Sequence, residues 1–155
     1  MKYELVKTDT KMVSDKKLYR IKALVAIGSL VSVGDLGGYV ESEKNLSQVY
    51  GNAWVCGNAR VYGNARVSGN AQVSGDARVS SRNDWLLVGP SKSSGKFTTA
   101  FKDSFIGVRV VCGCFSGTVA EFSKSIEETH KNNQKHLEQY RLFCQLIAFN
   151  FGVEK

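Results

Sequence analysis

The chain of 155 residues contains few side chains of the types that make or break bonds. An imidazole can act as a general base, and imidazoles and thiolates can bind zinc. A strong zinc signature needs two cysteines with about two to four residues between them and a matching second pair, whereas only one residue separates Cys112 from Cys114. Two small thiols on one face of a strand explain this pair better. We therefore predict no metal site, no cofactor and no catalytic residue among the candidates, which are His130, His136, Cys56, Cys112, Cys114 and Cys144.

A second group of candidate residues lies in a repeat that runs from Val49 to Arg78. Five consecutive hexads follow the pattern Val-x-Gly-Asn/Asp-Ala-x, and Val79-Ser80 opens a sixth. Ala and Val share one face of an extended strand, and the residue between them points the other way. Gly followed by Asn or Asp turns the chain. The period predicts a solenoid with three hexads, about 18 residues, per turn and with Val and Ala inside.

The outward positions of this solenoid predict a row of cations. Because equivalent positions of successive turns are ~4.8 Å apart, we expect Arg60 beside Arg78, with Arg66 on the next face. Neighbouring guanidinium groups repel unless an anion or a carboxylate bridges them. We interpret the row as an anion-binding ladder with aromatic stacking groups; the alternative is solvated charge that prevents aggregation. The predicted anion- or partner-binding residues are Arg60, Arg66, Arg78, Trp54, Tyr50, Tyr62, Arg82 and Lys96.

The repeats resemble those of the left-handed parallel β-helix hexapeptide-repeat proteins, a group of acyltransferases, γ-class carbonic anhydrases and non-catalytic members. Residues 18–24, 34–41 and 112–118 look like the flanks of small phage and prophage proteins of this group. The resemblance implies a phage context and self-association, often as a trimer, but no reaction. The acyltransferases use a histidine on or beside the β-helix and the γ-class anhydrases use three histidine ligands, whereas this chain has two histidines, both beyond the repeats.

The flanks of the repeat predict further elements. Residues 2–7 and 18–24 alternate like strands, with a polar turn from Asp9 to Lys17, and we expect them to cap the solenoid. Residues 25–48 are expected to form irregular first coils. After an exit turn at 81–84, we predict a strand at 85–88 and a hairpin of 97–102 with 106–112 that turns at Asp103-Ser104. A capping box of Thr118 and Glu121 opens a helix, and Asn132-Asn133 separates it from a second helix that begins near Gln134.

The second helix is apolar around much of its circumference. Its broad apolar face is formed by residues at helical spacing, which are Leu137, Tyr140, Phe143, Cys144, Ile147, Ala148 and Phe151. Leu146 and Phe149 extend this face nearly around the helix. Such a helix is either well buried or part of a subunit contact. We predict an oligomer interface formed by Tyr140, Phe143, Ile147 and Phe151.

Composition limits the class of protein. The net charge of +7 is spread along the chain, and the N-terminal segment is too charged for a secretion signal. Four cysteines without such a signal suggest a reducing cytoplasm, that of the host cell if the chain is phage-encoded. No apolar run is long enough to span a membrane.

These observations lead to one overall prediction. We expect a mainly β protein, with cap strands and a short left-handed parallel β-helix in residues 1–80 (regular hexads at 49–80) and a small α+β module with a β-hairpin and two C-terminal helices in 81–155. The expected function is non-catalytic binding by a phage-encoded homo-oligomer, a dimer or trimer. It would inhibit a host defence component through a protein surface or a bound nucleotide or nucleic acid. The alternatives are a degenerate acyltransferase and a structural or assembly protein.

Overall fold

The computed structural model describes residues 1–154 and divides the chain into two compact units, Met1–Asp84 and Trp85–Lys155. The predicted boundary lay after Ser80. The described part is mainly β, with two helices near its C-terminal end, as the sequence predicts. None of the helices within residues 1–154 combines the length and the apolar character that a membrane crossing requires.

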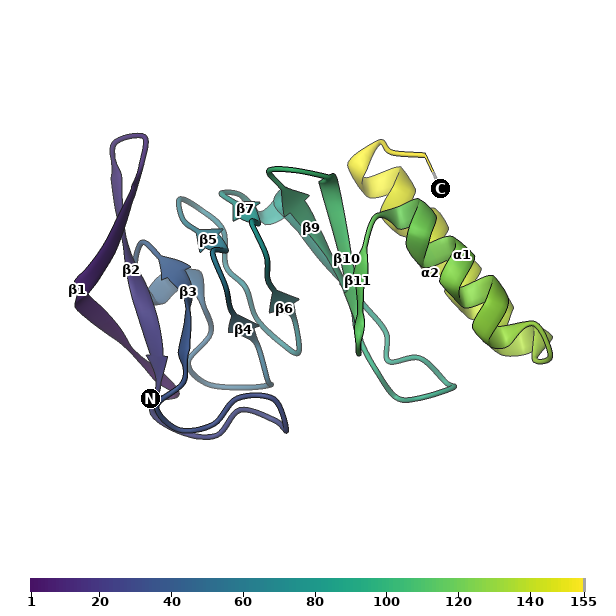
Figure 1. The fold of residues 1–155 in the computed structure, drawn as a ribbon, viewed down its shortest axis with the longest axis horizontal. Helices are drawn as coiled ribbons and strands as arrows, with labels where there is room; N and C mark the ends of the chain where they lie inside the picture. Colours follow the sequence, from purple (N-terminus) through teal and green to yellow (C-terminus); the bar gives the residue numbers. More distant parts are fainter. Residues whose placement is uncertain (155) are drawn as a thin grey trace. The chain divides into compact units, whose positions relative to one another are not determined.

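The first unit begins with a long antiparallel hairpin of β1 (Tyr3–Val13) and β2 (Lys16–Ala23), drawn in purple in Figure 1. The prediction of a turn from Asp9 to Lys17 is therefore wrong, because β1 continues to Val13 and the chain reverses at Ser14 and Asp15. None of the residues in this part of β1 is buried, and the one that is exposed is apolar Met12, so the segment lacks the alternation that identifies a half-buried strand. Strand β2 pairs in turn with β3 (Leu36–Val40), which attaches the hairpin to the first coil.

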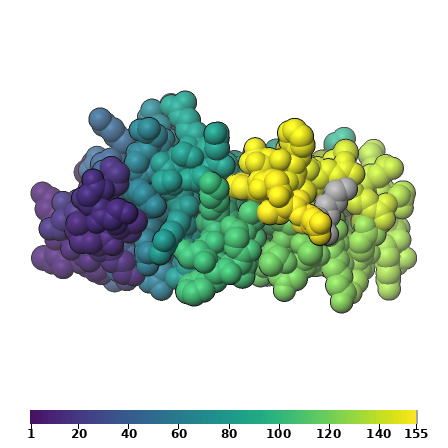
Figure 2. Space-filling model, turned by 90° about the horizontal axis from the view of Figure 1, so that it is seen from above, coloured from purple at the N-terminus to yellow at the C-terminus, as the bar shows by residue number. Residues whose placement is uncertain are grey.

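Parallel pairing at a spacing of 18 residues defines the repeat. Strand β5 (Arg60–Val61) pairs with β7 (Arg78–Val79), and β4 (Trp54–Val55) pairs with β6 (Gln72–Val73). Backbone hydrogen bonds join successive turns, for example from Arg60 N to Ala77 O at 2.9 Å. The larger sheet has the order β1-β2-β3-β5-β7. In Figure 2 the colours of this unit change gradually from purple to teal, as expected for turns laid down in chain order.

The interior of the repeat is aliphatic. Its Val and Ala residues are buried with at most 1% of their surface exposed, which confirms the predicted alternation. Small Ala side chains suit a narrow interior that a larger residue would overpack. The inward residues of the regular turns are Ala53, Val55, Ala59, Val61, Ala65, Val67, Ala71, Val73, Ala77 and Val79.

The first hexad does not follow this rule. Val49, which opens it in the sequence, is 71% exposed, and Leu46 takes the inward position and forms a parallel bridge with Val67. The spacing there is 21 residues, as it is between Tyr39 and Arg60. The extra residues form a corner at 47–50, where the Gln48 side chain accepts a hydrogen bond from Lys2 N at 2.8 Å and donates one to Tyr3 O at 3.0 Å. The corner is therefore longer because it reaches the first strand of the cap.

Short 3₁₀ helices lie at two places in the first unit, Glu43–Asn45 and Arg82–Asp84. The amide of Asn45 donates to the Gly63 and Ala65 carbonyl oxygens at 3.2 and 2.9 Å, so it holds the first helix against the next turn of the repeat. The carboxylate of Asp84 accepts hydrogen bonds from Ser80 N and Ser81 N, which orders the exit from the last turn.

The second unit is an antiparallel sheet with two helices packed on it. The sheet order is β11-β10-β9-β8, and its strands are β8 (Trp85–Val88), β9 (Thr98–Asp103), β10 (Gly107–Cys112) and β11 (Phe115–Gly117). Sequence analysis did not predict β11. The helices α1 (Val119–His130) and α2 (Gln134–Phe151) contribute Phe122, Ile126, Tyr140 and Ile147 to one core with Val110 of the sheet.

Local signals define both helices as predicted. The capping box is present, because Thr118 Oγ1 accepts from Glu121 N at 3.2 Å and Glu121 Oε2 accepts from Thr118 N at 2.8 Å. Asn133 caps α2 by accepting from His136 N, and Gly152 ends it in the left-handed conformation.

The interpretation of Cys112 and Cys114 as neighbours on one strand is wrong. Cys112 ends β10, Gly113 adopts a φ of 58°, and Cys114 lies in the turn before β11. Glycine permits this turn at no steric cost, so a local hairpin forms where the sequence suggested a continuous strand. All four cysteines are free thiols.

Candidate functional site: a cationic row and an adjacent hollow

One row of side chains crosses the larger sheet of the first unit. Arg20 of β2 is the register partner of Tyr39 of β3, Tyr39 that of Arg60 of β5, and Arg60 that of Arg78 of β7. We call Arg20, Tyr39, Arg60 and Arg78 the cationic row. Register partners share a face of the sheet at a strand spacing of ~4.8 Å, so Arg60 and Arg78 are neighbours on adjacent strands, as predicted.

The two ends of the cationic row differ in their charge balance. Arg20 is neutralised, because its Nε donates to Asp9 Oδ2 at 2.7 Å and its Nη1 donates to Gly37 O at 2.7 Å. Arg60 and Arg78 form no ion pair with any residue that the structure describes. The Nε atom of Arg60 is buried and has no hydrogen-bond partner among the described residues. A buried N–H without an acceptor is unfavourable by about 1–3 kcal/mol. The Arg60 end of the cationic row therefore contains one unsatisfied hydrogen-bond donor.

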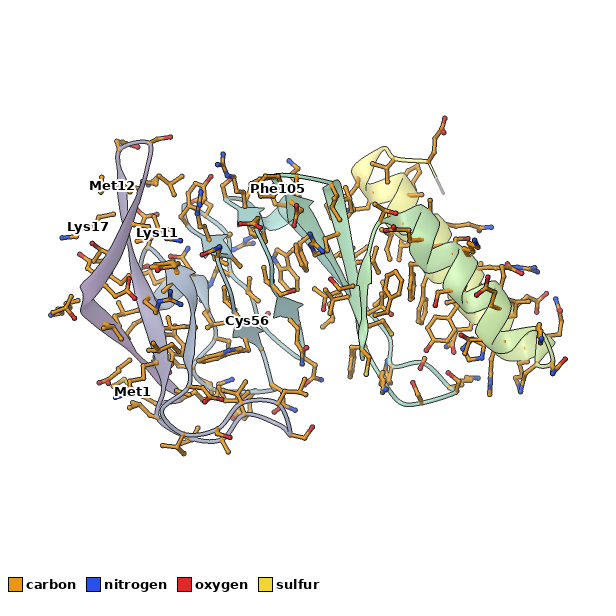
Figure 3. All side chains as sticks on the ribbon, viewed as in Figure 1. Met1, Lys11, Met12, Lys17, Cys56 and Phe105 are labelled. Carbon is orange, nitrogen blue, oxygen red and sulfur yellow. The ribbon has the colours of Figure 1, made fainter. Side chains whose placement is uncertain are left out.

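Two cations lie over the aromatic ring of Tyr39. The Lys11 Nζ lies 4.4 Å from its ring centroid and the Arg20 guanidinium carbon lies 4.6 Å from it. Its hydroxyl donates to Asp9 Oδ1 at 3.1 Å, and burial raises the pKa of Tyr39, as does that hydrogen bond. Figure 3 shows Lys11 projecting from the β1–β2 hairpin, and its Nζ donates to Asn58 Oδ1 at 2.9 Å. The cap thus adds positive charge to the face that carries the row.

A cationic hollow lies at the corner that follows β5. Its volume is about 700 Å³, and the charged residues that line it are Lys44, Arg66 and Arg82, all of which are exposed. Backbone from Gly63 to Ala65 forms part of its wall. Three cations and no carboxylate among the lining residues make this a place where an anion would be stabilised.

Glu41 is the carboxylate next to this corner, and it is already engaged. Its Oε2 accepts from Gly63 N at 2.7 Å and its Oε1 accepts from Lys16 Nζ at 2.9 Å. The hydrogen bond from Gly63 and the one from Lys16 lower the pKa of Glu41. The carboxylate therefore stabilises the turn and offsets Lys16, and it leaves the charge of the hollow uncompensated.

Other predicted binding residues are placed differently. Trp54 was expected to point outward and stack on a ligand, but it is only 6% exposed because residues 27–36 cover it. Tyr50 is 82% exposed at the long corner, and Tyr62 is partly buried two residues after Arg60. Lys96 belongs to the second unit, where its side chain lies near Gly113.

Three members of the two cationic features were missed by sequence reasoning. Arg20 and Tyr39 enter the row through the antiparallel and 21-residue pairings, which a strict period of 18 cannot predict. Lys44 enters the hollow because its 3₁₀ helix packs against the next turn. The alternation of residues 18–24 was the one sequence signal that could have indicated Arg20. It places Arg20 on the face of the strand that points away from the buried Ile21.

The predicted oligomer residues lie largely inside the second unit. Tyr140 and Ile147 are in its core, and Phe143 and Phe151 are partly buried against that core. The exposed apolar side chains of α2 are instead Leu142, Leu146 and Phe149. They recur at helical spacing and so form one stripe, which we call the apolar stripe.

The histidines lie in the second unit, close to one aromatic ring. The rings of His130 and Tyr140 are stacked with centroids 5.0 Å apart, and His136 meets His130 edge-on at 5.9 Å. Within residues 1–154, no group of three or more His, Cys, Asp or Glu side chains is arranged to hold a metal ion.

The parallel pairing and aliphatic interior define the class of the first unit as a β-solenoid repeat. A comparison with protein families agrees, because the family described as YdcK Beta solenoid repeat matches residues 53–69, 59–72 and 65–81. The match covers the regular turns and does not extend to the hairpin cap or the second unit. A search of curated proteins finds no match.

Proposed function

We propose that this chain is a non-catalytic binding protein whose first unit binds a phosphate-bearing anion at Arg60 and Arg78. The observation that carries the proposal is the pair itself. Arg60 and Arg78 are register partners on adjacent strands, and neither forms an ion pair with a residue that the structure describes. Phosphate oxygens accept paired hydrogen bonds from guanidinium groups and would relieve the repulsion between the two side chains.

A nucleotide is the form of anion that fits the surroundings best. Tyr62 directly follows β5, two residues after Arg60, and its partly buried ring would offer a stacking surface next to the two arginines. The cationic hollow at the following corner extends the positive surface. Solvated charge that only prevents aggregation remains the alternative, and it predicts no preference for one anion over another.

Calorimetric titration with ADP, with pyrophosphate and with adenosine tests this proposal. ADP should bind with the highest affinity, pyrophosphate more weakly, and adenosine weakest, since it lacks the phosphates. Arg78→Gln should reduce the affinity for ADP at least about tenfold, the equivalent of one charge-assisted contact. Arg78 is exposed, so this change should leave the fold intact.

Two controls make the result specific. Lys124→Gln removes the same charge from an exposed position of α1 and should leave the affinity for ADP unchanged. Arg60→Lys keeps the charge but removes the planar donor set, so it should weaken ADP binding. Equal affinity for adenosine and ADP, or equal losses in Arg78→Gln and Lys124→Gln, would contradict the proposal.

The finer features of our prediction rest on the resemblance stated above. We propose that the repeat coils in the left-handed sense, that the protein is phage-encoded and acts in the host cytoplasm, and that it binds a host defence component or that component's nucleotide ligand. Self-association as a dimer or trimer is part of the same proposal, with the apolar stripe as its contact. Recovery of a defence protein that competes with ADP for the wild-type chain, and not for Arg78→Gln, would support the link to defence.

A further inference from the structure

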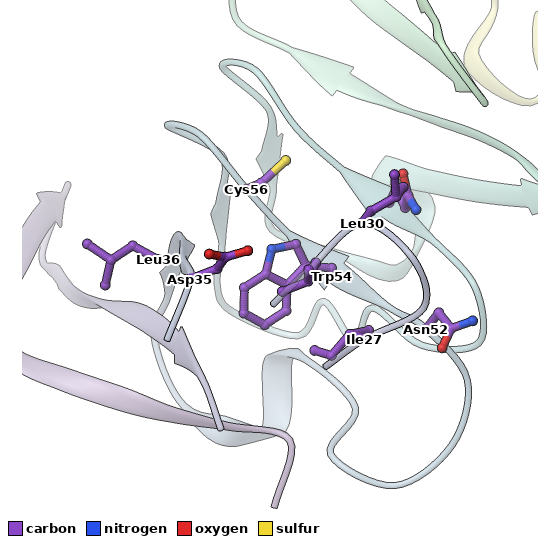
Figure 4. A pocket seen from close by; sticks show the side chains of 9 residues that line it. Ile27, Leu30, Asp35, Leu36, Asn52, Trp54 and Cys56 are labelled. Carbon is purple, nitrogen blue, oxygen red and sulfur yellow. The ribbon is translucent and has the colours of Figure 1, made fainter. Parts of the chain in front are cut away.

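A separate cavity of about 300 Å³ lies in the first unit beside β4 and β6, shown in Figure 4. Trp54 forms part of its wall, and Ile27, Leu30 and Leu36 add aliphatic surface. Leu30 and Leu36 are more than half exposed, so they stand at its mouth, whereas Trp54 lies deep. Its size is at the low end of the range of small-molecule sites, about 300–1,000 Å³.

The segment over this cavity is held by its own hydrogen bonds. Ile27 N donates to Val31 O at 2.9 Å, and Ser32 N donates to Asp35 Oδ2 at 2.8 Å. The backbone of Asp35 is fixed to β2, because Ala23 N donates to Asp35 O at 2.9 Å. Asp35 is exposed, so it lies at the mouth with Leu30 and Leu36, and its carboxylate is positioned before any ligand arrives. Its Oδ1 atom accepts no hydrogen bond from the described residues, so it can receive one from a ligand.

The charge of the cavity has the opposite sign to that of the whole chain. Asp35 is the one charged side chain among the described residues that line it, although the chain carries +7. Burial raises the pKa of the Cys56 thiol, which therefore stays neutral at physiological pH. Figure 4 shows the Asp35 carboxylate and the indole of Trp54 directed toward one another. Asn52 and Gln72 supply neutral polar groups.

We infer that this cavity binds a small organic ammonium ion, with the charged nitrogen beside Asp35 and the apolar substituents against Trp54, Leu30 and Leu36. A carboxylate beside an indole is the combination that stabilises an ammonium group, through an ion pair and through attraction to the π-system. An anionic ligand would be repelled from this cavity, so the site is distinct from the cationic row and does not depend on it.

Choline is a suitable probe because an uncharged alcohol of the same shape, 3,3-dimethylbutan-1-ol, exists for comparison. Choline added to the wild-type protein should shift the indole N–H resonance of Trp54, assigned with the variant Trp85→Phe. The neutral alcohol should bind at least about tenfold more weakly, since it lacks the charge that Asp35 and Trp54 recognise.

Asp35→Asn keeps the size of the side chain and an oxygen that can accept from Ser32 N. We expect it to lower the affinity for choline at least about tenfold. Asp15→Asn, which removes one exposed carboxylate from the β1–β2 turn, should leave choline binding unchanged. The inference is overturned if about 10 mM choline does not shift the Trp54 resonance, because any Kd would then lie far above that concentration. It is also overturned if the alcohol binds as tightly as choline, or if Asp35→Asn binds choline with the affinity of the wild type. ADP binding should be unaffected by Asp35→Asn, so the two sites can fail independently.

Discussion

Gly51 stands where two turns of the repeat approach each other closely. It adopts a φ of 72°, and a Cβ atom added there would overlap the carbonyl oxygen of Gly69 in the next turn. Gly57 occupies the equivalent position of the following hexad with a φ of 64°, but its added Cβ would lie 3.5 Å from the nearest atom, Gly75 N. The same residue type in the same motif therefore has two different steric environments.

We predict that Gly51→Ala lowers the free energy of unfolding by about 1–3 kcal/mol more than Gly57→Ala. Both changes place a side chain in the left-handed region, which is unfavourable by about 1–2 kcal/mol, and only Gly51→Ala adds an overlap with backbone. Urea denaturation followed by circular dichroism measures both values. If Gly51→Ala and Gly57→Ala lose the same free energy of unfolding, the prediction is wrong, because the two turns at Gly51 would then move apart at little cost.

The sequence predicted residue positions best where they repeat. Val55 and its equivalents face inward as the alternation requires, and Arg60 meets Arg78 at the expected spacing. The same rule predicted that Val49 points inward and Trp54 outward, and both predictions are wrong. Leu46 takes the inward position in place of Val49, and the segment 27–36 covers Trp54. Those outcomes depend on neighbours distant in the chain, which a local period does not contain.

The hairpin of β9 and β10 depends on a buried carboxylate in its turn. Asp103 accepts hydrogen bonds from Phe105 N at 2.9 Å and Arg109 Nε at 2.7 Å, and its side chain is fully buried. Burial alone would raise the pKa of Asp103, but the hydrogen bonds from Arg109 and from the turn outweigh it and lower the pKa. The charged form is therefore the one that the folded hairpin stabilises.

A lowered pKa in the folded state gives stability that is present at neutral pH and is lost as the pH falls below about 4. We predict that Asp103→Asn lowers the free energy of unfolding at pH 7 by about 1–3 kcal/mol, because Arg109 loses its partner. The variant should also lose less stability than the wild type between pH 7 and pH 3. Urea denaturation at both values measures this, and an identical decrease in the two proteins would contradict it.

Elements with strong local signals were predicted well from the sequence. The strand 85–88, the hairpin and the two helices lie close to their expected ranges, because capping residues and apolar periodicity define them locally. The second half of β1 and the short β11 were missed. Both are stabilised by pairing with a neighbouring strand and carry little periodicity of their own.

At the scale of the whole molecule, the apolar stripe on α2 is a row of large apolar side chains that the fold of one chain leaves exposed. Leu142, Leu146 and Phe149 are exposed, and Phe149 is 87% exposed. Large exposed apolar side chains in a row are typical of contact surfaces. The predicted contact residues Tyr140 and Ile147 already belong to the core, so the stripe is the apolar surface that α2 leaves exposed.

We predict that Phe149→Glu shifts the protein toward the monomer, since it places a charge in the centre of an apolar contact. Asn150→Glu adds the same charge at the neighbouring exposed position and should leave the assembly unchanged. Sedimentation velocity over a range of protein concentrations distinguishes the two. If the wild-type protein is monomeric at all concentrations, the prediction that the apolar stripe forms a contact between two copies is wrong.

The long corner at 47–50 shows that a turn of this coil can gain three residues while Leu46 and Val67 stay aligned across the interior. The length of a corner can therefore change without altering the alignment of the side chains in the interior. A peptide tag inserted between Val49 and Tyr50, both largely exposed, would be displayed outside the stack without changing what lies within it. The same separation would let such a protein acquire new recognition loops by insertion during evolution, with the scaffold preserved.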